Sequence, residues 1–286
     1  MSLFLQALYE GLINGSIYAM VAMGISLVWG VMGILSFSQG EFLMIAMFIS
    51  YFFATGTGLP PVIALPICMA VLFALGFVTY KTIIYKALQG PTLSQRLITF
   101  ALSMVLVNTM LVFFGGTMKT IQNTGMEGSI NLGMLVIAKN RIIPLIIAVC
   151  ICIFMLWFLN KTVTGKAIRA TSMDKQAAEY VGINTEKTYT LAFAISAAIA
   201  GAAGCALSYY YYCYPNVGAN FQLFSFIAVV MGGFGSVGGA IIGGLIMGLV
   251  DSFSGVYFNP AFKYLCVCVV FMLILQFKPK GLFGGK

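Results

Sequence analysis

Two carboxylic acids interrupt a sequence that is mostly apolar. Glu41 follows the polar run Ser36-Phe37-Ser38-Gln39-Gly40, and Asp251 closes a later apolar stretch. An acid at membrane depth costs a few kcal/mol on insertion scales, so it is a functional candidate by default. Glu41 is equally compatible with a structural role, because the N-terminus of a helix favours negative charge. Asp251 lies near the predicted end of a span, within reach of interfacial water, so a structural role is the stronger expectation there.

The other reactive side chains form no catalytic pattern. The chain has no histidine, and its seven cysteines lie mostly inside apolar runs, where a free thiol acts as a small hydrophobic side chain. Thr164-Gly165-Lys166 has a superficial likeness to a phosphate-binding loop, but Asn160 stands where the first glycine of that motif belongs. We therefore expect no catalytic residue, metal site or cofactor in this chain. A membrane enzyme is the least supported class of function.

Composition predicts a membrane protein. Hydrophobic residues make up 61% of the chain and charged residues 8%, with a mean hydropathy of +1.02, whereas soluble domains carry roughly 25% charged residues. The apolar runs are roughly 15 to 30 residues long, which predicts helices rather than barrel strands. We expect an all-α integral membrane protein with about eight transmembrane helices in a single domain over residues 1–286. The net charge of +8 comes without a nucleic-acid-binding motif, so nucleic acid is not an expected partner.

Two of the hydrophobic elements are broken or re-entrant. Residues 3–35 form an apolar run that stops at the polar segment 36–41, and the apolar residues 42–54 are too few to span a membrane alone. The second element, 222–251, is divided by the glycine-rich segment 232–239, and both of its ends are expected on the same side. Paired interrupted segments in two halves of a membrane protein indicate a translocation pathway between them. The candidate pathway residues are Ser36, Ser38, Gln39, Glu41, Gly232, Gly233 and Gly235.

For the glycines of the second break, tight helix packing is a competing explanation. Gly235, Gly239 and Gly243 are spaced four residues apart, and so are Gly244 and Gly248, as in the small-residue patterns that bring membrane helices close together. Each glycine taken alone fits this packing role better than a pathway role. The two breaks taken as a pair favour the pathway.

A charged segment separates two of the later apolar runs. Residues 161–187 hold eight charged residues, five of them basic. Thr171 and Asp174 have capping-box spacing and Gly182 is a residue type that ends helices, which predicts a short helix over about 172–181. The apolar face of this helix would comprise Met173, Ala177, Tyr180 and Val181. The segment is either a docking element or a plain connector between two spans.

The distribution of basic residues predicts the orientation of the chain. Eleven basic residues fall in the segments 81–96, 161–187 and 278–286, and four fall in the segments expected on the opposite side. Basic loops are retained in the cytoplasm, so the charged loop 161–188 is expected there. Counting the predicted spans back from these loops puts the N-terminus on the outer side of the membrane.

Four stretches resemble the LivH-type permeases of branched-chain amino-acid ABC importers, and the likeness covers nearly the whole chain. They are Asn14 to Ala19; Leu35 to Glu41, similar to the family's Asn-Phe-Ala-His-Gly-Glu segment; Gly165 to Asn184, similar to its cytoplasmic loop; and Gly232 to Gly244 with Pro279-x-Gly281. The four are specific together and weak singly. The resemblance implies a multi-pass protein of the bacterial cytoplasmic (inner) membrane that translocates branched-chain, hydrophobic amino acids by alternating access.

The resemblance also implies that loop 161–188 carries a coupling helix that docks on a cytoplasmic ATPase. The matching positions are Gly165, Arg169, Ala170, Asp174, Ala177, Ala178, Gly182, Ile183 and Asn184. The implied partners are a second related permease, two cytoplasmic ABC ATPase subunits, an extracytoplasmic substrate-binding protein and membrane lipid. ATP and Mg are expected on the partner ATPases.

Two alternatives stay open at the level of sequence. Gln39 stands where the family has histidine, and related permeases are thought to carry urea or short amides, so the same class of importer with such a substrate is one alternative. A stand-alone channel or facilitator is the other, and in it the charged loop is an ordinary connector. The second permease is either another copy of this chain or a different one, which the family favours.

Overall fold

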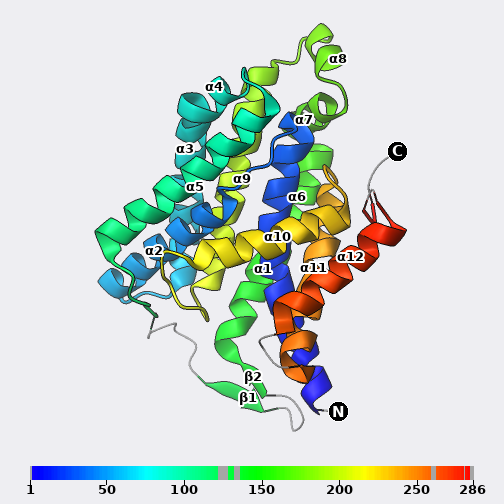
Figure 1. The fold of residues 1–286 in the computed structure, drawn as a ribbon. Helices are drawn as coiled ribbons and strands as arrows, with labels where there is room; N and C mark the ends of the chain where they lie inside the picture. The colour runs from blue at the N-terminus through cyan, green and yellow to red at the C-terminus, as the bar shows by residue number, and fades with distance from the viewer. Residues whose placement is uncertain (1, 122–127, 132–135, 259–261, 280, 284–286) are drawn as a thin grey trace.

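The chain folds as a bundle of long helices (Figure 1). The computed structural model describes residues 2–121, 128–131, 136–258, 262–279 and 281–283. The helices are α1 (Ser2–Met32), α2 (Gln39–Thr57), α3 (Leu65–Thr79), α4 (Tyr85–Ala87), α5 (Thr92–Phe114), α6 (Ile142–Lys161), α7 (Val163–Met173), α8 (Lys175–Tyr180), α9 (Thr185–Leu207), α10 (Val217–Gly232), α11 (Val237–Tyr257) and α12 (Lys263–Phe277). A short antiparallel hairpin, β1 (Ser129–Asn131) with β2 (Val136–Ala138), lies between α5 and α6.

The expected all-α membrane fold is confirmed. Seven helical stretches in the described residues are long and apolar enough to cross a membrane, and α10 and α12 are shorter apolar helices. One of the seven, Pro61–Ala87, is continuous through α3 and α4 by way of a π-helical turn at Tyr80–Ile84. The structure adds the small β1–β2 hairpin, which sequence analysis did not anticipate.

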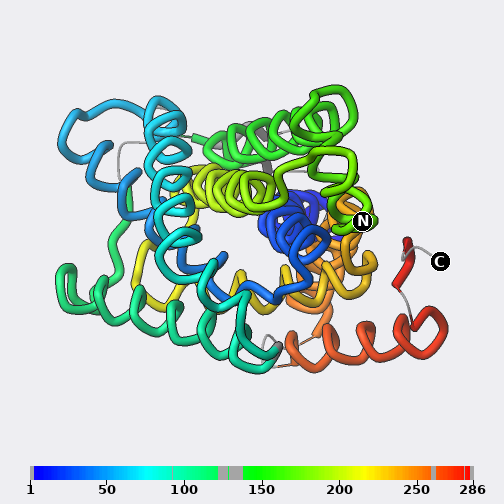
Figure 2. The backbone as a smooth tube through the Cα atoms, turned by 90° about the horizontal axis from the view of Figure 1, so that it is seen from above, coloured from blue at the N-terminus to red at the C-terminus, as the bar shows by residue number. Residues whose placement is uncertain are grey.

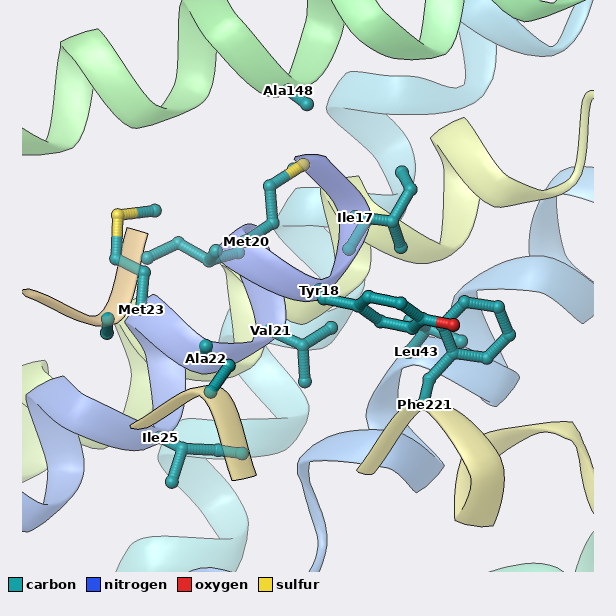
Figure 3. Close-up of a cluster of buried hydrophobic side chains, with 14 of the residues drawn as sticks. Ile17, Tyr18, Met20, Val21, Ala22, Met23, Ile25, Leu43, Ala148 and Phe221 are labelled. Carbon is teal, nitrogen blue, oxygen red and sulfur yellow. The ribbon is translucent and has the colours of Figure 1, made fainter. Parts of the chain in front are cut away.

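Helices α1 and α9 form the centre of the bundle. Both are almost wholly enclosed, whereas α5 exposes most of its side chains. Figure 2 shows α1 surrounded by other helices, with α5 and α12 along one outer edge. The apolar core around α1 includes Tyr18, whose ring points toward Phe221 (Figure 3). Helix α9 packs closely because its buried face is mostly Ala and Gly; a Cβ on Gly204 would lie 2.2 Å from the Leu43 carbonyl oxygen.

Glycines bring α11 against α1 along much of their length. A Cβ on Gly248 would lie 2.1 Å from the Cα of Gly15, and a Cβ on Gly244 would lie 2.4 Å from the Cα of Ala19. These separations leave no room for a side chain, so the two backbones touch directly. The packing role expected of the small residues in the second broken element is therefore confirmed for these two glycines.

Both predicted interruptions are present. Helix α1 ends at Met32, Gly33 adopts a left-handed backbone with φ +68°, and α2 begins only at Gln39. Helices α10 and α11 are separated by residues 233–236 and run antiparallel, because Gly232 packs against Gly239 while Ala228 packs against Gly243. The second element therefore goes in and returns, as the sequence predicts.

The two ends of the bundle differ in the segments that they carry. Figure 1 shows α4, α7 and α8 at one end, and the N-terminus with the β1–β2 hairpin at the other. Glu10 near the N-terminus forms an ion pair with Arg141 just before α6, with an N–O distance of 3.1 Å. Lys119 and Cys213 pair through backbone hydrogen bonds at that same end. The N-terminus and the segments around Arg141, Lys119 and Cys213 thus lie together, at the end opposite to the charged loop.

Candidate functional site

Glu41 occupies a hollow at the first break. The hollow has a volume of about 220 Å³ and is lined by Phe37, Glu41, Phe100, Ser103, Ala219, Gln222, Leu223 and Phe226. Glu41 is 3% exposed; its Oε1 accepts a hydrogen bond of 3.1 Å from the Ser103 hydroxyl, while its Oε2 has no partner in the described residues. Ser103 is the middle residue of α5. The carboxylate therefore lies at mid-depth of the bundle, as the start of α2 inside the membrane requires.

Gln222 of α10 holds the break in place. Its side-chain Oε1 accepts a 2.7 Å hydrogen bond from the backbone N–H of Gly40, and its Nε2 donates a 3.0 Å hydrogen bond to the carbonyl of Ser36. The α2 N–H groups and the loop carbonyls at a break need partners, because water cannot supply them in a buried setting. Gln222 is not among the residues predicted from the sequence, although an amide inside an otherwise apolar run was a signal for it.

Two glycines allow α2 and α10 to meet at this point. A Cβ on Gly40 would lie 2.3 Å from the Gly218 carbonyl oxygen, and a Cβ on Gly218 would lie 2.4 Å from that of Gly40. The Gly218 Cβ would also lie 2.8 Å from Oε2 of Glu41. Glycine at 218 thus avoids a clash with the unpartnered carboxylate oxygen.

The other polar residues predicted at the first break are buried within it. The hydroxyl groups of Ser36 and Ser38 lie 3.2 Å apart, and both side chains are buried. Gln39 is fully enclosed, and neither polar atom of its side chain has a partner in the described residues. Its Oε1 faces Gly24 of α1 near Ser196, the middle residue of α9. Gln39 therefore points into the centre of the bundle, whereas Glu41 faces the hollow.

The glycines predicted for the pathway lie at the opposite end of α10. Gly232 is packed against Gly239, and Gly235, with φ +80°, lies against Gly30 near the end of α1. Fourteen helical residues separate Gly218 from Gly232, which is about 21 Å at 1.5 Å per residue. The structure therefore does not bring Gly232, Gly233 and Gly235 together with Glu41, but α10 connects the two breaks directly.

The tail after α12 closes the second break. The N–H groups of Leu282 and Phe283 donate to the carbonyls of Met231 and Gly232, at 2.8 and 3.0 Å. Gly281 has φ +83°, and a Cβ on it would lie 2.6 Å from the Cα of Gly233. The C-terminal carbonyls of α10 are thus satisfied by a distant segment, and Gly233 serves this packing.

Asp251 is paired inside the protein rather than solvated at the interface, which corrects the expectation that it reaches water. Its side chain is 1% exposed, and Oδ1 lies 2.7 Å from Nζ of Lys263. Its Oδ2 accepts a hydrogen bond from the Tyr18 hydroxyl at 3.2 Å. The contacts of Asp251 still support a structural role, because they join α11 to α12 and to α1.

Helix α7 connects the charged segment rigidly to the bundle. The Thr162 hydroxyl caps it by accepting a 3.0 Å hydrogen bond from the Gly165 N–H. A Cβ on Gly165 would lie 2.2 Å from the Phe158 carbonyl oxygen, so only glycine allows this tight turn out of α6. The Arg169 guanidinium donates a hydrogen bond to the side chain of Asn160, and Ala170 is half-buried on the same helix. Gly165 and Arg169 thus fix the angle between α6 and α7.

The predicted short helix over 172–181 is shorter than expected. Helix α7 extends to Met173, and α8 covers only Lys175–Tyr180. The capping-box prediction placed the start three residues too early: Asp174 itself is the cap, and its carboxylate accepts a 3.1 Å hydrogen bond from the Ala177 N–H. Thr171 instead donates to the Ala167 carbonyl within α7. An aspartate that competes for backbone N–H groups favours a new helix start over continuation.

The end of α8 matches the prediction. Gly182 has φ +86°, and the N–H of Ile183 donates a 3.0 Å hydrogen bond to the Ala178 carbonyl, as in a glycine-ended helix. Ala178 is buried and Ile183 half-buried, whereas Ala177 is exposed. Asn184 caps α9 by accepting a hydrogen bond from the Lys187 N–H at 3.0 Å. Most of the predicted coupling residues therefore shape the segment rather than present a side chain.

Around α8, three large apolar side chains project without cover in the described chain. Met173 is 85% exposed, Tyr180 88% and Val181 76%. They belong to the apolar face that the sequence predicts, although the bend at Asp174 divides it between two helices. Just inside this surface, a hollow of about 300 Å³ is lined both by α7 residues, including Arg169 and Met173, and by Gly235 of the second break. The charged segment thus adjoins the break that α10 links to Glu41.

A helical membrane domain with two interrupted elements, and with an exposed apolar surface at one end, has the features of a transport protein. The chain belongs to the family described as "Branched-chain amino acid transport system / permease component", which matches residues 7–275. The resemblance seen in the sequence is thereby confirmed. Family membership and the seven apolar helices make the chain a multi-pass permease of the cytoplasmic membrane.

Curated relatives support the same family. The chain is 28% identical to the high-affinity branched-chain amino acid transport system permease protein BraD of Pseudomonas aeruginosa, over 98% of this chain and 96% of BraD. It is 27% identical to LivH of Escherichia coli K12, with the same coverage of both chains. A probable LivH of Methanocaldococcus jannaschii is 23% identical over 88% of this chain and 81% of the relative. No solved structure matches the chain.

Proposed function

We propose that this chain is the permease subunit of an ATP-binding-cassette importer that moves branched-chain, hydrophobic amino acids by alternating access. In this proposal the chain works with a second related permease, two cytoplasmic ATPase subunits and an extracytoplasmic substrate-binding protein. ATP and Mg bind to the ATPases. The permeases that the chain resembles are named for branched-chain amino acid transport, which supports this choice of substrate.

The observation that carries the coupling part of the proposal is the apolar surface of Met173, Tyr180 and Val181. An apolar patch that is exposed beside basic residues on a membrane protein's polar end marks a protein-binding surface better than a solvated connector. The segment is tied to the bundle by the tight α6–α7 turn at Gly165, so a force on α8 moves α7 as a rigid body. A plain connector needs neither feature.

The proposed route of transmission runs along α10. Helix α7 adjoins the second break at Gly235, and the other half of α10 holds the first break through Gln222 and Gly218. A shift of α7 on ATP binding is transmitted through α10 to the hollow that contains Glu41. The substrate passes between the broken elements of this chain and the partner permease, with Ser36, Ser38, Gln39 and Glu41 as polar groups near that route.

The stand-alone channel or facilitator is the competing function, and an ATPase capture experiment separates the two. We would replace Met173 and Tyr180 together with glutamate and measure how much ATPase subunit co-purifies from native-like membranes. Both side chains are almost fully exposed, so the double variant should fold normally. Tyr212→Glu is the matched control, because Tyr212 is 55% exposed and follows Tyr210, whose ring contacts Arg141 beside Glu10 near the N-terminus.

We expect the double variant to lose most of the captured ATPase, because two buried charges in an apolar interface are costly. The Tyr212→Glu control should retain it. Equal recovery from the wild type and the double variant would contradict the coupling role and favour the facilitator.

A further inference from the structure

We propose that the Glu41 hollow is a subsite for the ammonium group of the transported molecule. The proposal rests on the proposed importer function and specifies which end of the substrate this chain recognises. It also separates amino acids from urea and simple amides, which carry no ammonium group.

The first observation is that Glu41 is a buried carboxylate among the residues that line the hollow. The side chain is 97% enclosed, its Oε1 is held by Ser103, and its Oε2 has no partner in the described residues. No lysine or arginine nitrogen of the described chain lies within 4.0 Å of this carboxylate. A buried carboxylate requires a compensating cation or hydrogen-bond donor. A Cβ on Gly218 would lie 2.8 Å from Oε2, so glycine at 218 avoids a side-chain contact with that oxygen.

The second observation is the aromatic wall of the hollow. The rings of Phe37 and Phe100 meet edge to face at 6.3 Å, and those of Phe37 and Phe226 stack at 6.2 Å. Aromatic faces attract ammonium groups through their quadrupole, and the attraction is stronger where water is excluded. A carboxylate beside aromatic rings selects a cation over a neutral amide, and the rings accept the apolar carbon atoms that follow it.

The chain itself contains a filled site of this kind. The ammonium group of Lys263 lies 2.7 Å from the Asp251 carboxylate and 5.6 Å from the centroid of the Phe224 ring. The Glu41 hollow has the same two components, an enclosed carboxylate and phenylalanine rings, without a lysine. Its volume of about 220 Å³ is below the roughly 300–1,000 Å³ of pockets for whole drug-sized ligands. The hollow therefore holds the ammonium end of a substrate rather than all of it.

The test measures equilibrium binding to the purified complex of both permeases and the ATPases, without the binding protein. Three radiolabelled probes share one branched side chain: leucine, 3-methylbutylamine, which lacks the carboxylate, and 4-methylpentanoate, which lacks the amine. We expect the wild type to bind leucine and the amine at least about tenfold more tightly than the acid. The acid has no ammonium group and so lacks the charge-assisted hydrogen bond to Glu41.

Glu41→Gln should weaken binding of 3-methylbutylamine by about tenfold or more, because it removes the charge and keeps the shape. Asn108→Ala is the matched control: Asn108 lies five residues after Ser103 on α5, donates a hydrogen bond to the carbonyl of Met104 and does not line the hollow. Its binding should equal that of the wild type.

Four results would overturn the subsite. They are equal affinity of the wild type for the amine and the acid, no saturable binding of the amine, unchanged binding in Glu41→Gln, and loss of the second permease from the Glu41→Gln complex, which would assign the carboxylate to a subunit contact. If Glu41→Gln does not fold, the affinities of the wild type for the amine and the acid still test the subsite. The ATPase capture experiment tests the importer function separately. If the ATPase is captured as expected but the amine does not bind, only the subsite is refuted.

Discussion

Replacing Lys263 with methionine should destabilise the protein more than any other single neutralisation of a charge. Asp251 would remain 1% exposed, with only the 3.2 Å hydrogen bond from Tyr18 to stabilise its charge. Breaking a buried ion pair on one side costs roughly 3–5 kcal/mol. The Lys263 side chain is 33% exposed, so solvent weakens the pair, and we expect a loss near the lower bound, about 3 kcal/mol.

A double-mutant cycle of Asp251→Asn and Lys263→Met measures the interaction between the two side chains. Asp251→Asn leaves a lysine that can partly reach solvent, so its cost should be smaller, about 1–2 kcal/mol. The double replacement removes both charges and should be within about 1 kcal/mol of the wild type, because buried pairs are often neutral against apolar substitutes. Lys81→Met is the matched control. The Lys81 ammonium lies 5.0 Å from the Phe77 ring, so its loss should cost at most about 1 kcal/mol.

The assay is equilibrium unfolding in mixed detergent micelles, followed by tryptophan fluorescence. The free energy of unfolding of the four variants and the wild type is compared at one detergent composition. Equal free energies of unfolding for Lys263→Met and the double variant would refute the prediction, because the unpaired Asp251 carboxylate would then not destabilise the protein. A larger loss of stability in Asp251→Asn than in Lys263→Met would refute it as well.

Three further predictions can be tested in the same unfolding assay. Gln222→Leu leaves two backbone groups at the α1–α2 break without partners and should cost about 2–4 kcal/mol. Gly248→Leu should cost about 3 kcal/mol or more, because its Cβ would overlap Gly15, whereas Gly255→Leu on the same helix meets open space and should be near neutral. Thr162→Ala removes the α7 cap and should cost about 1 kcal/mol; a change below 0.3 kcal/mol would show that the cap is dispensable.

Local patterns in the sequence predict most of the fold. Hydropathy and run length place the apolar helices, and the polar segment 36–41 and glycines 232–239 place both breaks. Gly182 ends α8 as predicted, because the left-handed backbone there is a property of one residue type. The start of that helix was misplaced, because Thr171 and Asp174 both fit a cap and only the structure shows which side chain bonds to a free N–H.

The partners of the polar residues depend on the tertiary structure. Gln222 and Gly40 are 182 positions apart, and their contact follows from the crossing of α10 over α2, which no local pattern encodes. The same holds for Asp251, whose partners come from α1 and α12, and for Gly233, which contacts the tail rather than Glu41. Sequence thus determined where the long apolar helices and the two breaks lie, because backbone hydrogen bonding and hydropathy are local. Tertiary structure decided which acid is neutralised and which faces a cavity, because that depends on which helices meet.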